Sequence, residues 1–291
     1  MTATSDECAD RTPRVVVVTD SSARLPSELA EAHGIRVVPL HILVGGADLR
    51  DGVDEMPADL YDRQATTAGA SPAELGAAYE RALDLSGGAG VVAVHISGAL
   101  SGTCGAADHA AAQLGDRVVV VDSRSAAMGA GFAALAAAEC AATGADLTAV
   151  AEQARAAASR SHAFIVVQRL DSLRRSGRIG GAAAWLGTAL SLKPLLRIDN
   201  GKLVLAQRVR TASKAVAAMI EQVCALVGDR TAAIAVHHVD DPDGAAAIAD
   251  ELAQRLPAAQ RVIVTDLGPV LAVHVGAGAL GVAVELPNHT G

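Results

Sequence analysis

Aromatic residues are scarce in this sequence, which has two Tyr, two Phe and one Trp among 291 residues. Proteins that hold single-stranded nucleic acids stack the bases on aromatic side chains, so this composition argues against such a surface. The formal net charge of −8 points the same way, because nucleic-acid-binding surfaces need clustered Lys and Arg. We therefore expect no nucleic-acid partner.

Cysteines are also few and widely separated. The four are Cys8, Cys104, Cys140 and Cys224, and no two of them form a C-x-x-C pair. Structural metal sites and disulfide-rich secreted domains both use closely spaced cysteines. The pattern indicates a reducing compartment, and we expect neither a metal nor another cofactor.

A long uninterrupted hydrophobic run is missing as well. The nearest candidate, residues 126–143, is mostly Ala with two Gly and one Glu, so it predicts a packed helix rather than a membrane span. The first 14 residues are polar and acidic, unlike a secretory signal peptide. We expect a cytoplasmic protein with no transmembrane segment.

Strand and helix patterns alternate from residue 15 to about residue 160. All-valine runs such as Val15–Val18 and Val118–Val121 are typical of parallel strands buried on both faces. One strand is predicted over Ile35–Leu43, with loops at 45–57 and 66–71. The alternation predicts a doubly wound parallel sheet, in which ligands bind at the carboxyl ends of the strands.

The second half has a different pattern. Two apolar segments, Leu195–Ile198 and Leu203–Val209, flank an Asn-Gly pair and predict a hairpin. A helix is predicted over Gly180–Leu192 and a glycine-rich loop over Gly268–Leu280. Hairpins mixed with helices indicate a mixed or antiparallel α+β sheet. We therefore expect an α/β protein of two domains, residues 13–161 and 162–291.

A strand, a loop of small residues and a helix follow one another between residues 91 and 114. Val91–Ile96 predicts the strand, and the helix is expected from about Gly105. The first turn of a helix has unpaired N–H groups and favours negative charge, and Ser and Thr hydroxyls add hydrogen-bond donors. The loop therefore predicts an anion site, with candidate contacts at Ser97, Ser101, Gly102 and Thr103.

Other chemistries fit this loop less well. Ser97 or Ser101 could act as a nucleophile with a histidine base, but neither lies in a G-x-S-x-G elbow. The sequence has no G-x-x-x-x-G-K-[ST] motif and no G-x-G-x-x-G after the first strand, which disfavours nucleotide binding. A serine-dependent hydrolase and a protein that binds a small phosphorylated metabolite remain the alternatives.

Further polar residues have both a structural and a functional interpretation. Thr67, in the segment TTAGAS, is either an ordinary loop residue or a hydroxyl donor beside a helix start. His274, in VHVGAGALG, is either a core histidine or a ligand contact that the glycines make accessible. The basic residues between 174 and 214 form either a solvated face or a partner surface.

Eight short motifs in order resemble the DegV family of bacterial fatty-acid-binding proteins over residues 15–284. No one of them is diagnostic, but their order is specific. They are TDSSARLP (19–26), TAGASP (67–72), ISGALSGT (96–103), DS before a glycine-containing helix (122–131), LDSLRRSGRI (170–179), KPLLRIDNGKL (193–203), VRTASKA (209–215) and LGPVLAVHVGAGALGV (267–282).

The resemblance implies a two-domain fold that holds a long-chain fatty acid, such as palmitate or oleate, between the domains. It implies that Thr67, Ser101 and His274 bind the carboxylate. The implied function is to present the acid to a separate fatty-acid kinase for acyl-phosphate formation in phospholipid synthesis, with no catalysis by the chain itself. Arg178 and Arg210 are candidates for the kinase-facing surface.

The chemistry of the residues agrees with this expectation. Hydroxyl, N–H and imidazole donors suit a carboxylate, and burial of an acyl chain contributes roughly 0.8 kcal/mol per CH₂. Four positions differ from the usual family motifs, namely Ala68, Ala70, Cys104 and Ala277. They leave the three expected contacts in place and bear on the preferred acyl length.

Overall fold

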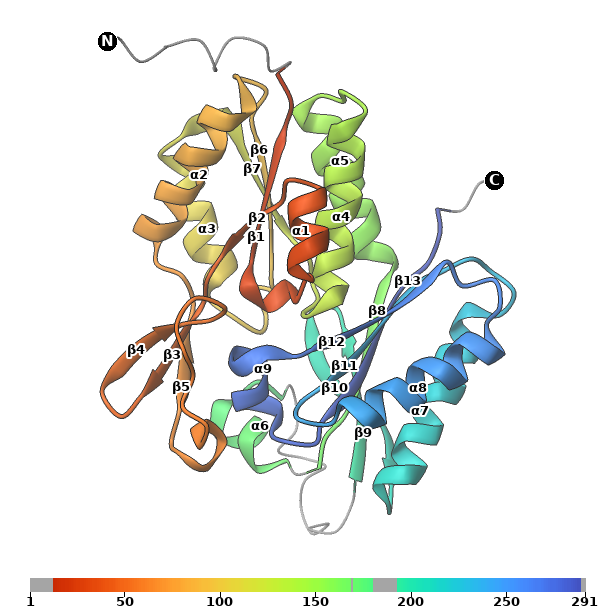
Figure 1. The fold of residues 1–291 in the computed structure, drawn as a ribbon. Helices are drawn as coiled ribbons and strands as arrows, with labels where there is room; N and C mark the ends of the chain where they lie inside the picture. Colours follow the sequence, from red (N-terminus) through yellow and green to blue (C-terminus); the bar gives the residue numbers. More distant parts are fainter. Residues whose placement is uncertain (1–12, 169, 180–192, 289–291) are drawn as a thin grey trace, which may run out of the picture.

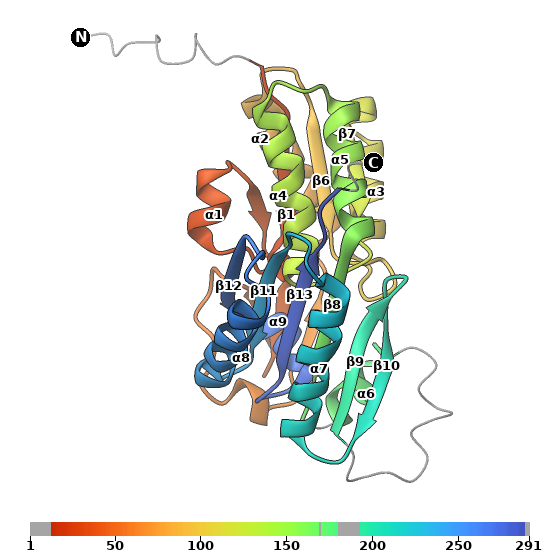
Figure 2. The same ribbon diagram turned by 90° about the vertical axis from the view of Figure 1, so that its right-hand side faces the viewer.

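The computed structural model describes residues 13–168, 170–179 and 193–288, and the helix predicted over Gly180–Leu192 lies outside them. In the described part of the chain the strands form three sheets (Figure 1). The two larger sheets follow one another along the molecule, with the parallel sheet in the upper part of the view and the second sheet in the lower part (Figure 2).

The first sheet has four parallel strands in the order β2-β1-β6-β7. The strands are β1 (Val16–Asp20), β2 (Arg36–Val38), β6 (Val91–His95) and β7 (Val118–Asp122). The helices beside it are α1 (Ser27–Ala32), α2 (Pro72–Ser86), α3 (Thr103–Ala112), α4 (Met128–Ala142) and α5 (Leu147–Arg160), with the short 3₁₀ turns η1 (Ser21–Ala23) and η3 (Gly115–Arg117). The predicted doubly wound parallel sheet is confirmed.

The valine runs explain why this sheet is covered on both faces. Val18 packs in one core with residues of α2 and α3, whereas its neighbour Val17 packs in another with residues of α4 and α5. Successive side chains of a strand point to opposite faces, so an unbroken apolar run requires helices on both sides. Figure 1 shows α2 and α3 on one side of the sheet and α4 and α5 on the other.

The second large sheet has six strands in the order β10-β9-β8-β13-β11-β12, and only β11 and β12 are parallel neighbours among these described strands. They are β8 (Ser161–Val166), β9 (Lys193–Asp199), β10 (Lys202–Val209), β11 (Ala233–His238), β12 (Arg261–Asp266) and β13 (Leu280–Glu285). Helices α7 (Ala212–Val227) and α8 (Pro242–Arg255) pack on one face. The mixed sheet and the β9–β10 hairpin are both confirmed.

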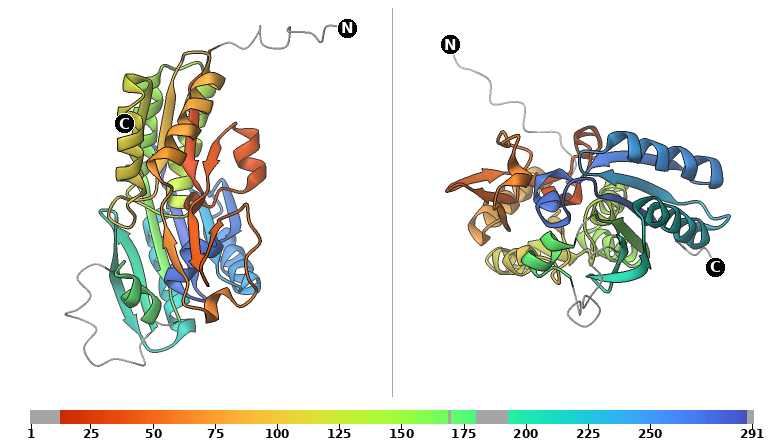
Figure 3. Two further views of the ribbon diagram at one scale, coloured as in Figure 1. Left: turned by 90° about the vertical axis from the view of Figure 1, so that its left-hand side faces the viewer. Right: turned by 90° about the horizontal axis from the view of Figure 1, so that it is seen from below.

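The third sheet corrects the prediction of a single strand over Ile35–Leu43. Pro39 interrupts that segment, because proline has no N–H for a sheet ladder, and β2 and β3 (His41–Val44) join different sheets. β3 pairs with β4 (Ala47–Arg50) and β5 (Thr66–Ala68), where loops were predicted. The Gly45-Gly46 turn between β3 and β4 was the missed hairpin signal. This small sheet stands to one side of the molecule (Figure 3).

The prediction of a loop over Gly268–Leu280 is wrong for its first eight residues. These form α9 (Gly268–Val275), which begins with Pro269 in its first turn and carries His274 in its last turn. Gly276 and Gly278 follow with positive φ angles. α9 packs against β3, β5, η1 and α6 (Asp171–Ser176), so it lies between the second sheet and the small one. The remaining short helix, η2 (Leu60–Asp62), precedes β5.

Candidate functional site

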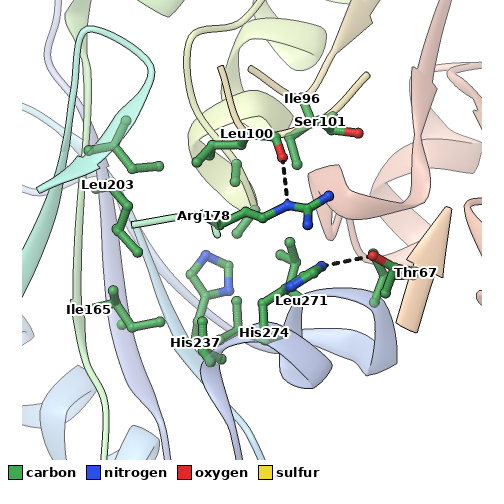
Figure 4. A pocket seen from close by; sticks show the side chains of 18 of the residues that line it. Thr67, Ile96, Leu100, Ser101, Ile165, Arg178, Leu203, His237, Leu271 and His274 are labelled. Carbon is green, nitrogen blue, oxygen red and sulfur yellow. Dashed lines mark hydrogen bonds between the residues drawn. The ribbon is translucent and has the colours of Figure 1, made fainter. Parts of the chain in front are cut away.

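A cavity of about 170 Å³ lies between the carboxyl end of the parallel sheet and the second sheet, on the face of that sheet away from α7 and α8 (Figure 4). This is roughly ten times the space that one water molecule needs. Most of the lining is apolar, including Leu100, Ile165, Ile198, Leu203 and Ala283. The polar side chains lining it, among the described residues, are Thr67, Ser101, Arg178, His237 and His274.

Thr67 and His274 meet at this cavity although 207 positions separate them. β5 pairs with β3 and places Thr67 opposite Ile42, while α9 places His274 in its last turn. The Oγ1 of Thr67 lies 2.8 Å from the Nε2 of His274, a hydrogen-bond distance (Figure 4). Two residues that the sequence singled out separately therefore form one pair.

The environment of His274 indicates which atom of this pair is the donor. Burial and the charge of Arg178 lower the pKa of His274 to about 4, so the imidazole is neutral at pH 7. Its Nδ1 is buried and has no hydrogen-bond partner among the described residues. A buried unpaired N–H is rarer than an unpaired acceptor, which favours the tautomer with hydrogen on Nε2. Nε2 then donates to Thr67, whose own hydroxyl hydrogen is free to donate to a ligand.

Ser101 and Gly102 line the cavity at the start of α3, which begins at Thr103. Gly102 is the N-cap residue and has no side chain with which to cap the first amides of the helix. Ser101 Oγ accepts a hydrogen bond from Thr103 N at 3.2 Å and lies 2.9 Å from Thr103 Oγ1. When the Thr103 hydroxyl is the donor of that second bond, the Ser101 hydroxyl is free to donate into the cavity.

Thr103 and Ser97 do not line the cavity. Thr103 is fully buried behind Ser101 and sits so close to Gly69 that a Cβ there would overlap its hydroxyl. Ser97 is also buried, and its Oγ donates to the carbonyl of Gly201 at 2.8 Å. Ser97 thus links the loop to the β9–β10 turn. The structure gives both residues supporting contacts, whereas the sequence predicted ligand contacts.

The two arginines predicted for a partner surface lie far apart. Arg178 lines the cavity, is exposed at its edge, and donates from Nε to the Leu100 carbonyl at 3.3 Å. Ile179 bridges to Leu203, close to the turn end of β10, whereas Arg210 follows the other end of that strand. Seven residues of extended strand separate the two positions by about 23 Å.

His237 is a cavity residue that the sequence interpretation missed as part of this site. It lies on β11 with 3% of its surface exposed, and its Nε2 accepts a hydrogen bond from Met128 N at 3.3 Å. Burial lowers its pKa to about 3, so this imidazole is also neutral. Only its place in the fold, beside the start of α4, brings it to the cavity; the sequence carried no local signal for it.

A buried acidic group supports the strand ends beneath the loop. Asp20 accepts hydrogen bonds from His95 Nδ1 at 2.9 Å, from Ile96 N at 3.0 Å and from Ser22 N at 3.1 Å. Burial raises the pKa of Asp20, but the His95 bond and charge, with the other donors, outweigh burial and hold it below its usual value. His95 in turn lies 2.7 Å from the Tyr79 hydroxyl.

The serine-hydrolase alternative finds no support in these contacts. Within the described residues no hydrogen bond joins a serine to a histidine, which is what a serine nucleophile needs. The Asp-His arrangement at Asp20 and His95 ends on Tyr79, not on a serine. Burial raises the pKa of the neighbouring Cys104 thiol to about 12, so Cys104 is not a thiolate.

Two features of other protein classes are absent from the described residues. No group of three His, Cys, Asp or Glu side chains is arranged to hold a metal ion in that part of the chain. Across residues 13–168, 170–179 and 193–288, no helix combines the length and the apolarity that crossing a bilayer requires.

The chain is similar to known proteins over nearly its whole length. Residues 14–286 match the family model described as "Uncharacterised protein, DegV family". A DegV domain-containing protein of Mycobacterium tuberculosis is 66% identical over 272 residues, which cover 94% of this chain and 97% of that protein.

Two solved structures are similar along their whole length. A DegV family protein from Thermus thermophilus, whose structure is described as one of fatty acid binding, is 33% identical with a TM-score of 0.88, over 94% of this chain and 100% of that one. DegV of Bacillus subtilis, described as a fatty acid binding protein, is 29% identical with a TM-score of 0.86, over 95% and 100%. The chain described here belongs to the DegV family.

Proposed function

We propose that this chain binds one long-chain fatty acid in the cavity, with the carboxylate at Thr67, Ser101 and the start of α3 and the acyl chain along the second sheet. The observation that carries the proposal is the distribution of polarity. The Thr67 hydroxyl on β5, the His274 imidazole on α9 and the start of α3 lie on one side of the cavity, and the strand faces of the second sheet on the other side are almost wholly apolar (Figure 4). A ligand with one anionic end and a long apolar tail has the same distribution.

The head of such a ligand finds donors at several points. The Thr67 hydroxyl donates while His274 donates to Thr67, and Ser101 and the first amides of α3 approach from the other side. His274 acts through Thr67 and stays neutral. Arg178, at the edge of the cavity, is the positively charged side chain among the described residues that line it, and its charge acts on His274.

The tail gains its affinity from burial. About 14 methylene groups contribute roughly 11 kcal/mol when they leave water, before the loss of translational and chain freedom is subtracted. The small residues Ala163, Gly281 and Ala283 leave room along the sheet for this chain. His237 is a polar residue among the apolar side chains that would line the tail, and its neutral imidazole can pack against an acyl chain without burying a charge.

The proposed role extends beyond binding. The chain would hold the acid in the cytoplasm, without a catalytic step of its own, and present the carboxylate to a separate fatty-acid kinase. Arg178 stands beside the head of the cavity, where a kinase would approach, while Arg210 would lie at the margin of such a surface. We place the division between the head-binding and tail-binding domains at residue 161, where β8 of the second sheet begins.

Lipid extraction from the purified full-length chain tests the proposal. We expect mass spectrometry of the denatured, extracted protein to detect long-chain fatty acids near one equivalent, and added palmitate or oleate to raise the melting temperature. A protein that yields no fatty acid and shows no shift with either ligand contradicts the proposal. A shift with inorganic phosphate alone would favour the phosphorylated-metabolite alternative.

A matched pair of variants tests the head contacts. Thr67→Val removes the hydroxyl and keeps the shape, and we expect palmitate affinity to fall by roughly 10- to 100-fold, since a hydrogen bond to a charged group is lost. Thr66→Val changes the exposed neighbour on the same strand and should leave affinity unchanged. Equal affinities in the two variants would remove Thr67 from the site.

A further inference from the structure

Arg24 connects three segments that are distant in the sequence. It follows η1, directly after the strand end that carries Asp20, and adopts a left-handed backbone conformation with φ of 52°. Its Nε donates to the carbonyl of Asp266 at 2.9 Å, and its Nη2 lies 3.7 Å from a carboxylate oxygen of the same residue. Its Nη1 lies 3.5 Å from Oδ1 of Asp51. Arg24 therefore touches both the end of β12 and the chain just after β4.

These contacts link Arg24 to the two elements that carry Thr67 and His274. Asp266 ends β12, accepts a hydrogen bond from Gly268 N at the start of α9, and so precedes the helix that carries His274. Asp51 follows β4 in the small sheet whose third strand, β5, carries Thr67. The guanidinium thus lies between the supports of Thr67 and His274.

The packing around Arg24 is close. Asp51 is 3% exposed, and burial raises its pKa. The positive charge of Arg24 acts in the opposite direction and partly offsets the cost of burying this carboxylate. A Cβ at Gly268 would overlap the Arg24 guanidinium, and Gly268 has a positive φ of 68°. The first residue of α9 accordingly has no side chain where the arginine passes.

We propose that Arg24 is a positioning residue for the head of the cavity, holding α9 and the small sheet at the spacing that joins His274 to Thr67. It does not line the cavity, so it acts through these two elements. Its effect on ligand affinity rests on the fatty-acid-binding function proposed above. Its effect on the position of α9 does not depend on that function, because the contacts of Arg24 are made within the chain and need no ligand.

The chain offers a matched control in Arg160. Its Nε donates to the Leu286 carbonyl at 3.0 Å and its Nη2 to Glu285 at 3.1 Å, the same two kinds of contact that Arg24 makes. The exposed fractions of the side chains are similar, 16% for Arg160 and 21% for Arg24. Arg160 ties the end of α5 to the end of β13, away from α9 and β5.

Hydrogen exchange and palmitate binding in Arg24→Gln and Arg160→Gln test the inference. We expect amides of residues 268, 270–275 and 66–68 to exchange roughly tenfold faster in Arg24→Gln without added ligand, and at the wild-type rate in Arg160→Gln. NMR titration should show the His274 pKa moving up from about 4 toward its ordinary value only in Arg24→Gln. Palmitate affinity should fall several-fold in that variant and not in the control.

The outcomes separate the inference from the proposed function. Equal exchange in the two segments and an unchanged His274 titration in Arg24→Gln would overturn the positioning role, whatever the wild type binds. A wild type without palmitate binding would contradict the proposed function, while the exchange and titration results would still decide the role of Arg24. Should Arg24→Gln fail to fold, Arg24→Lys keeps the charge near Asp51 without the Nε contact, and it should loosen α9 more than Arg160→Lys does.

Discussion

The two walls of the cavity are built in different ways. The polar wall consists of strand β5 of the small sheet, the loop after β6 and the start of α3, and it presents Thr67, Ser101 and Gly102. The wall toward the second sheet consists of strand faces, and it presents side chains such as Ile165, Ile198 and Ala283. A helix start exposes unpaired amides beside the hydroxyls of its loop, whereas mid-strand faces expose only side chains.

This difference shows how one cavity can hold an amphipathic molecule. Hydroxyls, a neutral imidazole and the first amides of α3 gather on one wall, so the head site has hydrogen-bond donors without a charged side chain in the interior. The apolar wall needs no special motif, because any half-buried strand face supplies it. The C-terminal half of the chain is not wholly apolar at the cavity, because it also contributes the imidazole nitrogens of His237 and His274.

We expect the largest effect, on the free energy of unfolding, from a substitution of Asp20, which supports the loop of the polar wall. Asp20→Ala removes the acceptor shared by His95, Ile96 N and Ser22, and leaves those buried donors unpaired. We expect a loss of roughly 3–5 kcal/mol in the free energy of unfolding, measured by urea denaturation. Asp108→Ala, at an exposed position on α3, is the control and should change little. A small effect at Asp20 would mean that the strand ends are held in some other way.

The pH dependence of stability tests the lowered pKa of His274. The pKa of His274 is about 4 in the folded protein and near 6.5 when unfolded, so the unfolded chain takes up the proton first as pH falls. Stability that is present above pH 6.5 is therefore lost between pH 6.5 and 4, by about 3 kcal/mol for this one group. Urea titrations across that range should show a shallower loss for His274→Gln than for the wild type. Parallel curves would contradict the lowered pKa.

The apolar wall should tolerate a polar group poorly. Ile198→Asn places an amide on the cavity face of β9, and it must lose water when an acyl chain packs against it. We expect palmitate affinity to fall by roughly 10-fold in isothermal titration, equivalent to about 1–2 kcal/mol. Arg197→Asn, at the exposed neighbouring position, should leave affinity unchanged. A similar loss in both variants would show that the hairpin, not its apolar face, determines binding.

The edge of the cavity gives the smallest effect. Arg178→Ala removes an exposed charge, so palmitate affinity should fall by only about two- to fivefold, as is usual for exposed charge interactions. The same variant should raise the pKa of His274, because the Arg178 charge lowers it. Arg174→Ala, an exposed arginine on α6, should do neither. An unchanged His274 titration in Arg178→Ala would contradict the proximity of the two groups.

The sequence predicted the sheets better than it predicted the contacts between them. The valine runs and the Asn200-Gly201 turn are local signals, and both gave the correct elements. Thr67 and His274 could be singled out separately, but their hydrogen bond joins residues 207 positions apart and depends on β5 and α9, neither of which was predicted. The small sheet that carries Thr67 could have been predicted in part, because Gly45-Gly46 is a turn signal for the hairpin of β3 and β4.

Residues that act by connecting segments were the hardest to interpret. Ser97 and Ser101 lie in the same small loop, yet Ser97 bonds to Gly201 and only Ser101 lines the cavity. Nothing local distinguishes them, because the difference comes from the β9–β10 turn that packs above Ser97. Arg24 and His237 likewise gain their roles from partners more than 100 positions away.

The position of the ligand carboxylate is the most direct test of the proposed head site. Palmitate labelled with ¹³C at the carboxyl carbon should give one shifted NMR signal when bound to the wild-type chain, and that signal should not titrate near the ordinary pKa of a carboxylic acid. Thr67→Val should move it, and Ile198→Asn should leave it in place even where affinity falls. A carboxyl signal that titrates as in free solution, or that responds to Ile198→Asn and not to Thr67→Val, would contradict a head site at Thr67 and Ser101.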